Sequence, residues 1–154
     1  AAFMALLQLP DSRFGVSDIM DYVQLDAVQK RFNITQGDID QILVWLKQAH
    51  IHWGLDSQHK SFVSEGVTEQ DAYSWWWGLR RLLMGMLAPD KEWVVDNLLT
   101  IPDVEGQSAL VLGKLIEIVD LLGTFADQLN TPRTPAIWAD VLLLFFTIIL
   151  VFSC

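Results

Sequence analysis

The chain has 154 residues, of which 52% are hydrophobic and 7 are tryptophan. This composition predicts a folded domain with a well-buried core and argues against disorder. The formal net charge is −9, whereas a protein that grips phosphates over its whole surface is basic, so strong general DNA binding by this chain alone is not expected. We predict a single all-α domain over residues 1–154, with at most a short strand near residues 50–55.

One cysteine, Cys154, stands at the end of the sequence. No disulfide can form within the chain, and a metal site built on several thiolates is excluded. The first residues lack the basic segment of a signal peptide. These features are consistent with a cytoplasmic location.

The first part of the chain is expected to be helical. Residues 1–8 form the tail of a helix, which Leu9-Pro10 ends because proline pushes its predecessor out of helical geometry. The next helix opens near Val16, with Ser17 as its N-cap and Asp18 at the positive end of its dipole. A short helix is predicted over residues 25–32.

The clearest helix start is a capping box. Thr35 and Asp38 stand three residues apart, with aspartate in place of the usual glutamate, and apolar residues follow at helical spacing. These residues are Ile39, Ile42, Leu43, Leu46 and Ala49. Residues 50–55 then alternate weakly and predict a short strand or an extended turn, with Gly54 as the breaker. The polar residues 56–70 are expected to form a surface loop.

The segment YSWWWGLRRLLMGMLAP, residues 73–89, predicts a core helix. It is apolar nearly all round, so it should lie inside the molecule rather than along its surface. Two stripes at helical spacing define two faces that need covering. One stripe holds Trp75, Leu79, Leu82 and Met86, and the other holds Trp76, Leu83 and Leu87. Pro89 ends the helix.

The last third of the chain predicts two further helices. An acidic connection over residues 90–107, with a short helix at 92–99, leads to Ser108, which is expected to cap a long amphipathic helix ending at Leu129. Its polar stripe consists of Lys114, Glu117, Asp120, Thr124, Asp127 and Gln128. Thr134 and Pro135 start the final helix with a cap and a proline at the first position.

Residues 141–154 carry no charge and hold only Thr147 and Ser153 as polar side chains. The stretch is shorter than the roughly 18 to 20 apolar residues that a membrane span needs. A buried terminal helix, or a segment cut where the domain that covers it should begin, is the favoured interpretation. A membrane anchor, or a segment that docks on a partner, is the alternative.

The sequence contains no motif for catalysis or nucleotide binding. It has neither a G-x-x-x-x-G-K-[ST] loop nor a G-x-S-x-G elbow. Its carboxylates fall at helix starts or on a solvated helix face, which the helix dipole and solvation explain. The three histidines, His50, His52 and His59, could approach Asp56, but their spacing matches no zinc motif. We therefore expect no catalysis, no metal and no cofactor in this segment.

Arg80 and Arg81 lie in the predicted core helix, where charged side chains need partners. Each follows a tryptophan by four residues, so the guanidinium groups can stack on Trp76 and Trp77 of the preceding turn. DNA contact is the alternative role. The candidate nucleic-acid contacts of the chain are Arg13, Lys60, Arg80 and Arg81. A solvated charge remains the default for Arg13 and Lys60, as for Lys30 and Arg31.

Residues 17–55 also allow a winged-helix interpretation, because two short helices, a longer helix and an extended stretch follow one another. The longer helix opens with Asp38 and Asp40, which would repel phosphates, and offers Lys47 near its far end. A three-helix packing unit is therefore favoured. An autonomous DNA binder is the alternative.

Several segments resemble the gamma subunit (RecC) of bacterial exodeoxyribonuclease V. The matched residues Trp75, Trp77, Gly78, Leu79, Arg81, Leu83, Gly85 and Met86 follow the pattern W-x-(F/W)-G-L-x-R-x-L-x-G. LPDSRF at 9–14, LDAVQKRFNIT at 25–35, IHWGLD at 51–56 and PDVEGQSALVLGKL at 102–115 are similar to that subunit in the same order. The likeness extends to about Trp138 and suggests an internal fragment of such a subunit. Trp75, Trp77, Gly78, Leu79, Leu83 and Gly85 are the expected structural core.

The resemblance implies a function beyond what the residues themselves indicate. The gamma subunit looks like a helicase that has lost its ATPase residues, partners the beta and alpha subunits, forms channels for the separated strands and helps to read the Chi signal. The complex is an ATP-dependent exodeoxyribonuclease and helicase that acts on double-strand ends in recombinational repair. ATP and magnesium would then belong to the partner subunits. This segment would be a non-catalytic scaffold that meets DNA through the complex, and membrane association is not expected.

Overall fold

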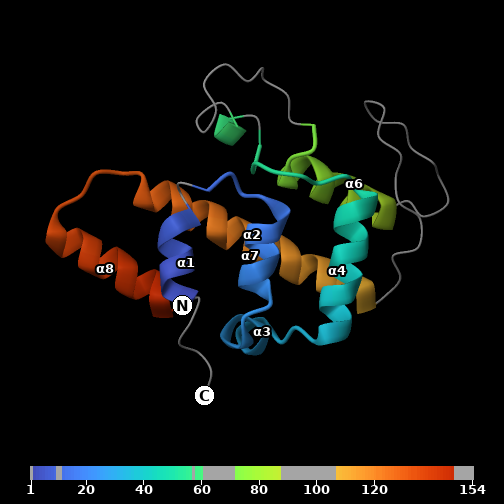
Figure 1. The fold of residues 1–154 in the computed structure, drawn as a ribbon, viewed down its shortest axis with the longest axis horizontal. Coiled ribbons are helices and arrows are strands. Elements are labelled where there is room, and N and C mark those ends of the chain that lie inside the picture. Colours follow the sequence, from blue (N-terminus) through green and yellow to red (C-terminus); the bar gives the residue numbers. More distant parts are fainter. Residues whose placement is uncertain (1, 10–11, 57, 61–71, 88–106, 148–154) are drawn as a thin grey trace.

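The computed structural model describes residues 2–9, 12–56, 58–60, 72–87 and 107–147. The helices of the described residues include α1 (Ala2–Gln8), α2 (Val16–Val23), α3 (Asp26–Phe32), α4 (Gln36–Gln48), α6 (Trp75–Leu87), α7 (Gln107–Leu129) and α8 (Pro135–Phe146) (Figure 1). No strand forms within the described ranges. The all-α fold class predicted from the sequence is confirmed.

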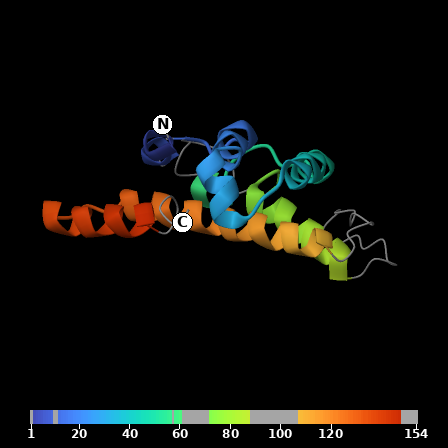
Figure 2. The ribbon, with the colours of Figure 1, turned by 90° about the horizontal axis from the view of Figure 1, so that it is seen from below.

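The long helix α7 is the spine of the fold. It contacts both α4 and α6, and its apolar face is buried from Val111 to Ala126. Figure 2 shows α1–α4 on one side of α7, with α6 and α8 in the layer of α7 itself. The predicted polar stripe lies opposite the core, with Glu117, Asp120 and Thr124 exposed. One apolar face along a single long helix therefore holds elements from both halves of the chain together.

The capping box at the start of α4 forms as predicted. The hydroxyl of Thr35 accepts a hydrogen bond from the amide of Asp38 at 3.2 Å, and the Asp38 carboxylate accepts one from the amide of Thr35 at 2.8 Å. At the start of α8, Thr134 accepts from the amide of Ile137 at 3.5 Å, and Pro135 occupies the first turn. These local signals were readable from sequence because both partners lie within one turn.

Two predicted caps are wrong. Helix α2 begins at Val16 after Gly15, which makes no side-chain cap, so Ser17 lies inside the helix. Ser108 likewise lies inside α7, which begins at Gln107. Serine is favoured both at N-caps and in the first turn, and the pattern alone does not separate the two positions.

Residues 50–55, here called the extended segment, form an extended turn and not a strand. On one side the segment bonds to the start of α2. The carbonyl of His52 accepts from the amide of Val16 at 3.2 Å, and the amide of Gly54 donates to the carbonyl of Arg13 at 2.8 Å. Gly54 has φ +80°, a left-handed conformation that glycine adopts at little cost.

On its other side the extended segment bonds to the start of α6. The amide of His52 donates to the carbonyl of Tyr73 at 2.9 Å, and the carbonyl of Gly54 accepts from the amide of Trp75 at 2.9 Å. The segment thus ties two helix starts that lie far apart in the sequence. Its backbone polar groups find partners without forming a sheet.

Sharp bends border the extended segment. Phe14, His50 and Tyr73 have φ values of 51°, 54° and 67°. Bulky residues adopt this left-handed region at a cost and need surrounding contacts to hold them there. The backbone bonds of the extended segment, together with the burial of Phe14, supply such contacts.

The core helix α6 is buried on one face. Trp75, Leu79 and Leu82 are at most 1% exposed, whereas Leu83 and Met84 are 41% and 43% exposed. The prediction that both faces are covered is wrong for Leu83, which does not belong to the core of the described residues. An apolar stripe in the sequence does not show whether another element of the fold packs against it.

Helix α8 carries apolar side chains into solvent. Leu143 and Leu144 are 65% and 57% exposed, while Val141 and Leu142 pack partly against the core. The predicted buried terminal helix is therefore wrong for this part of the tail. Residues 148–154, the predicted helix at 92–99 and residues 61–70 of the predicted loop lie outside the described residues. Among the described helices, none combines the length and apolarity that crossing a bilayer requires.

Candidate functional site

A row of stacked side chains lies beside the extended segment. The rings of His52 and Tyr73 are stacked, with centroids 5.1 Å apart and planes 7° apart. Tyr73 packs at a tilt on Trp77 with centroids 5.4 Å apart, and the guanidinium carbon of Arg81 lies 4.6 Å from the Trp77 ring centroid. We call these four residues the aromatic ladder.

The aromatic ladder runs from solvent into the fold. His52 at one end and its neighbour Tyr73 are exposed, Tyr73 to 49%, and Arg81 at the other end is 6% exposed. Trp77 and Arg81 are four residues apart on α6 and therefore share a face, as the spacing predicts. Arg81 also donates from Nη1 to the carbonyl of Ala49 at 2.8 Å. The carbonyl that ends α4 thus serves as a partner of the buried guanidinium.

We expect Arg81→Lys to lower the free energy of unfolding by about 1 to 3 kcal/mol. A lysine ammonium cannot combine the planar stack on Trp77 with the hydrogen bond to Ala49. Urea denaturation monitored by circular dichroism measures the change. The matched control is Arg80→Lys, since Arg80 is exposed and its replacement should change stability by less than about 0.5 kcal/mol. Equal losses in the two variants would contradict this role of Arg81.

A second cluster surrounds Trp53. The guanidinium carbon of Arg13 lies 5.9 Å from the Trp53 ring centroid, and the ammonium of Lys60 lies 5.0 Å from it. Lys60 is only 4% exposed, and it donates to the carbonyl of Ala72 at 2.6 Å. The default expectation of a solvated charge at Lys60 is therefore wrong, because the ammonium group finds partners inside the fold.

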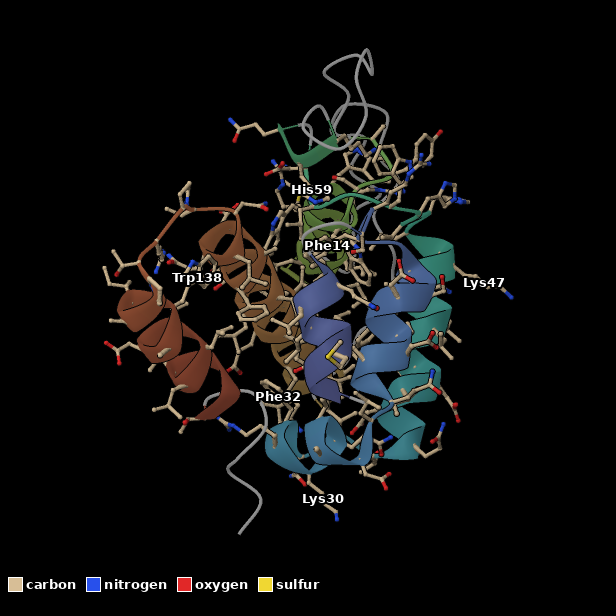
Figure 3. The ribbon with its side chains drawn as sticks, turned by 60° about the vertical axis from the view of Figure 1, so that its left-hand side comes forward. Phe14, Lys30, Phe32, Lys47, His59 and Trp138 are labelled. Atoms are coloured by element: carbon tan, nitrogen blue, oxygen red, sulfur yellow. The ribbon has the colours of Figure 1, made fainter. Side chains whose placement is uncertain are left out.

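The candidate nucleic-acid contacts divide into two groups. Arg13 and Arg80 are exposed, whereas Lys60 and Arg81 are buried. Arg80 donates from Nε to the carbonyl of Trp76 at 3.4 Å. The structure brings Arg13 and Lys60 together around one indole and places Arg81 in the aromatic ladder. Figure 3 shows two other cations, Lys30 and Lys47, pointing away from the body of the molecule.

Sequence reasoning missed His52 and Tyr73 as members of a surface cluster. They lie 21 positions apart in the sequence, and only folding brings them together, through the hydrogen bond from the amide of His52 to the carbonyl of Tyr73. The available signal was a tyrosine two positions before the tryptophan run. A tyrosine at that place predicts burial as readily as exposure.

The three histidines do not converge on a metal site. His52 stacks on Tyr73, and His59 packs edge-on against Phe14 with centroids 5.0 Å apart, as Figure 3 shows for Phe14 and His59. The Nδ1 atom of His59 accepts from the amide of Leu55 at 3.4 Å. In the described ranges, no group of three or more potential ligands is arranged to hold a metal ion.

The stability of the fold should depend on the protonation of His59. Burial lowers the pKa of His59 below its ordinary value of 6.5, while Asp56 and Asp127 act in the opposite direction. As pH falls, His59 therefore takes up a proton in the unfolded chain before it does so in the folded chain. The stability that the neutral, buried His59 contributes is complete above about pH 6.5 and is lost as pH falls below that value. We expect His59→Gln to flatten the decline of Tm over the range of about pH 5 to 7.

The control for this experiment is His50→Gln, because His50 is exposed. Thermal denaturation followed at several pH values compares the two variants with the unmodified chain. A pH profile that His59→Gln leaves unchanged, or that His50→Gln alters equally, would contradict the role assigned to His59.

These features define an all-α domain whose most distinctive side chains form a partly exposed aromatic and cationic surface. The family model described as RecBCD enzyme subunit RecC fourth domain matches residues 1–149, and the chain belongs to this family. The resemblance to a segment of RecC that the sequence motifs indicate is thereby confirmed.

Curated RecC proteins from distant bacteria are similar to the chain. RecC of Escherichia coli (strain K12) is 29% identical over 142 residues, which cover 91% of this chain and 12% of that protein. RecC of Mycolicibacterium smegmatis is 30% identical over 138 residues, covering 89% and 12%. RecC of Buchnera aphidicola subsp. Schizaphis graminum is 24% identical over 143 residues, covering 93% and 14%. The chain thus spans 12 to 14% of the length of these relatives.

Proposed function

We propose that the chain is a non-catalytic scaffold segment of the gamma subunit of exodeoxyribonuclease V. In this role it supports DNA unwinding, degradation of double-strand ends and Chi-regulated recombinational repair through contacts with the DNA channel and with the beta and alpha subunits. ATP and magnesium are bound by those partner subunits, and the complex acts in the cytoplasm. The match to the RecC fourth domain over residues 1–149 carries this proposal.

Exposed aromatic and apolar side chains support a role in contacts. Tyr73 is 49% exposed, and Leu143 of α8 is 65% exposed. Aromatic residues and arginine contribute most of the binding energy at protein interfaces, and exposed apolar surface commonly marks such sites. The exposed Arg13 and Arg80 are the candidates for limited contact with DNA in a chain whose net charge is −9.

An autonomous winged-helix DNA binder is the second candidate. The order α2, α3, α4 and extended segment favours it. The surface of α4 argues against a winged-helix DNA binder. Leu43 and Val44 are 40% and 49% exposed, whereas a recognition helix presents polar and basic groups to the major groove. Asp38 is engaged in the capping box with Thr35, and Asp40 adds a further negative charge near the start of α4.

Co-purification tests the scaffold role. The tagged chain is incubated with the beta and alpha subunits, and duplex DNA binding is measured in parallel at low and moderate salt. We expect recovery of the partner subunits together with weak duplex binding. Recovery of neither subunit, together with tight and salt-sensitive duplex binding that Lys47→Ala abolishes, would contradict the scaffold role and favour the winged-helix role.

A further inference from the structure

A hollow with a volume of about 690 Å³ lies along one side of α4. Its lining includes Leu43, Val44, Leu46 and Ile51, and we call this hollow the α4 groove. Leu46 and Ile51 are 3% and 4% exposed and belong to the core, whereas Leu43 and Val44 are 40% and 49% exposed. The groove therefore offers accessible apolar side chains above a fixed floor.

The polar groups that line the α4 groove are lysine and histidine. Lys47 is exposed and points away from the body of the molecule (Figure 3). His52 is held in place by its stack on Tyr73 at 5.1 Å and by the bonds of its backbone amide and carbonyl. None of the lining residues is acidic, although the chain has 19 acidic and 10 basic residues. The groove thus complements an apolar partner that carries carboxylates.

The surrounding backbone favours a helix as the occupant. The amides and carbonyls of His52 and Gly54 bond to the neighbouring segments, so this stretch offers no open strand edge to an added β-strand. The exposed lining of the groove combines the aliphatic Leu43 and Val44 with Lys47, His50 and His52. The bases of a single-stranded nucleic acid stack on aromatic faces, whereas the His52 ring is already stacked on Tyr73, so aliphatic side chains of a helix match this lining better.

We propose that the α4 groove binds an acidic amphipathic helix supplied by another subunit. Aliphatic side chains of that helix lie on Val44 and Leu43, and its carboxylates face Lys47 and His52. Leu43 and Val44 lie on helix α4, and His52 is held by its stack on Tyr73. The groove therefore needs little additional ordering when the partner helix binds. This inference deepens the proposed scaffold function and rests on it for the identity of the assembly.

Photocrosslinking from Val44 tests the proposal in the complete gamma subunit. Val44 is 49% exposed, so a photoreactive phenylalanine analogue at this position leaves the core unchanged. The subunit is assembled with its partners and irradiated, and the crosslinked segment is sequenced by mass spectrometry. The matched control carries the same analogue at Leu110, which is 69% exposed on α7. Lys47→Glu is introduced into both.

We expect Val44 to crosslink to a segment of another subunit with aliphatic residues at helical spacing and several acidic residues. Lys47→Glu should lower this yield at least about threefold while the yield at Leu110 stays unchanged. A basic segment, a segment of the same subunit, nucleic acid, or no product at Val44 would overturn the proposal. If co-purification succeeds but the predicted crosslink is absent, the scaffold role is retained and the proposed helix-binding role of the α4 groove is rejected. If the crosslink forms but co-purification fails, only the scaffold role of the tagged chain is rejected.

Discussion

Trp75→Ala is expected to lower the free energy of unfolding by about 3 to 5 kcal/mol. Trp75 is completely buried, and its indole Nε1 donates to the carbonyl of Phe14 at 2.8 Å across 61 positions of sequence. The substitution removes a large apolar side chain and leaves a buried carbonyl without this donor. Urea denaturation monitored by circular dichroism measures the loss.

Two further variants separate the causes of the effect at Trp75. Trp75→Phe keeps an aromatic ring and loses the hydrogen bond, so a smaller loss of about 1 to 2 kcal/mol is expected. Trp77→Ala should also cost about 1 to 2 kcal/mol, because Trp77 is only half-buried and mutational costs scale with burial. A loss at Trp77 as large as that at Trp75 would show that the two indoles contribute equally to the core.

Gly78→Ala is expected to destabilise the fold by about 1 to 3 kcal/mol through overpacking. A Cβ atom at Gly78 would overlap Cγ1 of Ile51 and lie 2.5 Å from its Cδ1. Helix α6 therefore approaches the extended segment so closely that only glycine fits. Gly78 belongs to the expected structural core, and the structure shows the extended segment as its close neighbour.

The matched control is Gly113→Ala in α7, because a Cβ atom there would meet nothing within 4 Å. It should stabilise the chain by about 0.5 to 1 kcal/mol, since alanine is the better helix former. Placing Gly78→Ala in a background with Ile51→Ala should recover at least about 1 kcal/mol of its cost. Stabilisation by alanine at Gly78 as well as at Gly113 would contradict the close contact.

The sequence predicts the parts of the fold that depend on near neighbours. The capping box of Thr35 and Asp38 forms, and the helical spacing from Ile39 to Ala49 predicts α4. The link between Trp75 and Phe14 joins residues 61 positions apart, and that between Lys114 and the carbonyl of Asn33 joins residues 81 positions apart. Hydrophobic periodicity indicates the secondary structure of one segment at a time, so it cannot predict hydrogen bonds between distant segments.

The candidate site was predictable in part. The four-residue spacing between Trp77 and Arg81 predicts their stack, which is present at 4.6 Å. The burial of Lys60 was not predictable, because Trp53 and the carbonyl of Ala72 reach it only after the extended segment has folded. The left-handed bend at Tyr73 has no signal in the sequence, since bulky residues rarely adopt it.

Hydroxyl-radical footprinting of Tyr73 in the complete gamma subunit tests the scaffold role most directly. Tyr73 is a 49% exposed member of the aromatic ladder, and its rate of oxidation is compared before and after the beta and alpha subunits are added without DNA. We predict that assembly lowers this rate at least about threefold, because contact residues at interfaces are shielded from water. An unchanged rate at Tyr73, with His52 and Trp77 equally unaffected, would contradict a contact role for this surface.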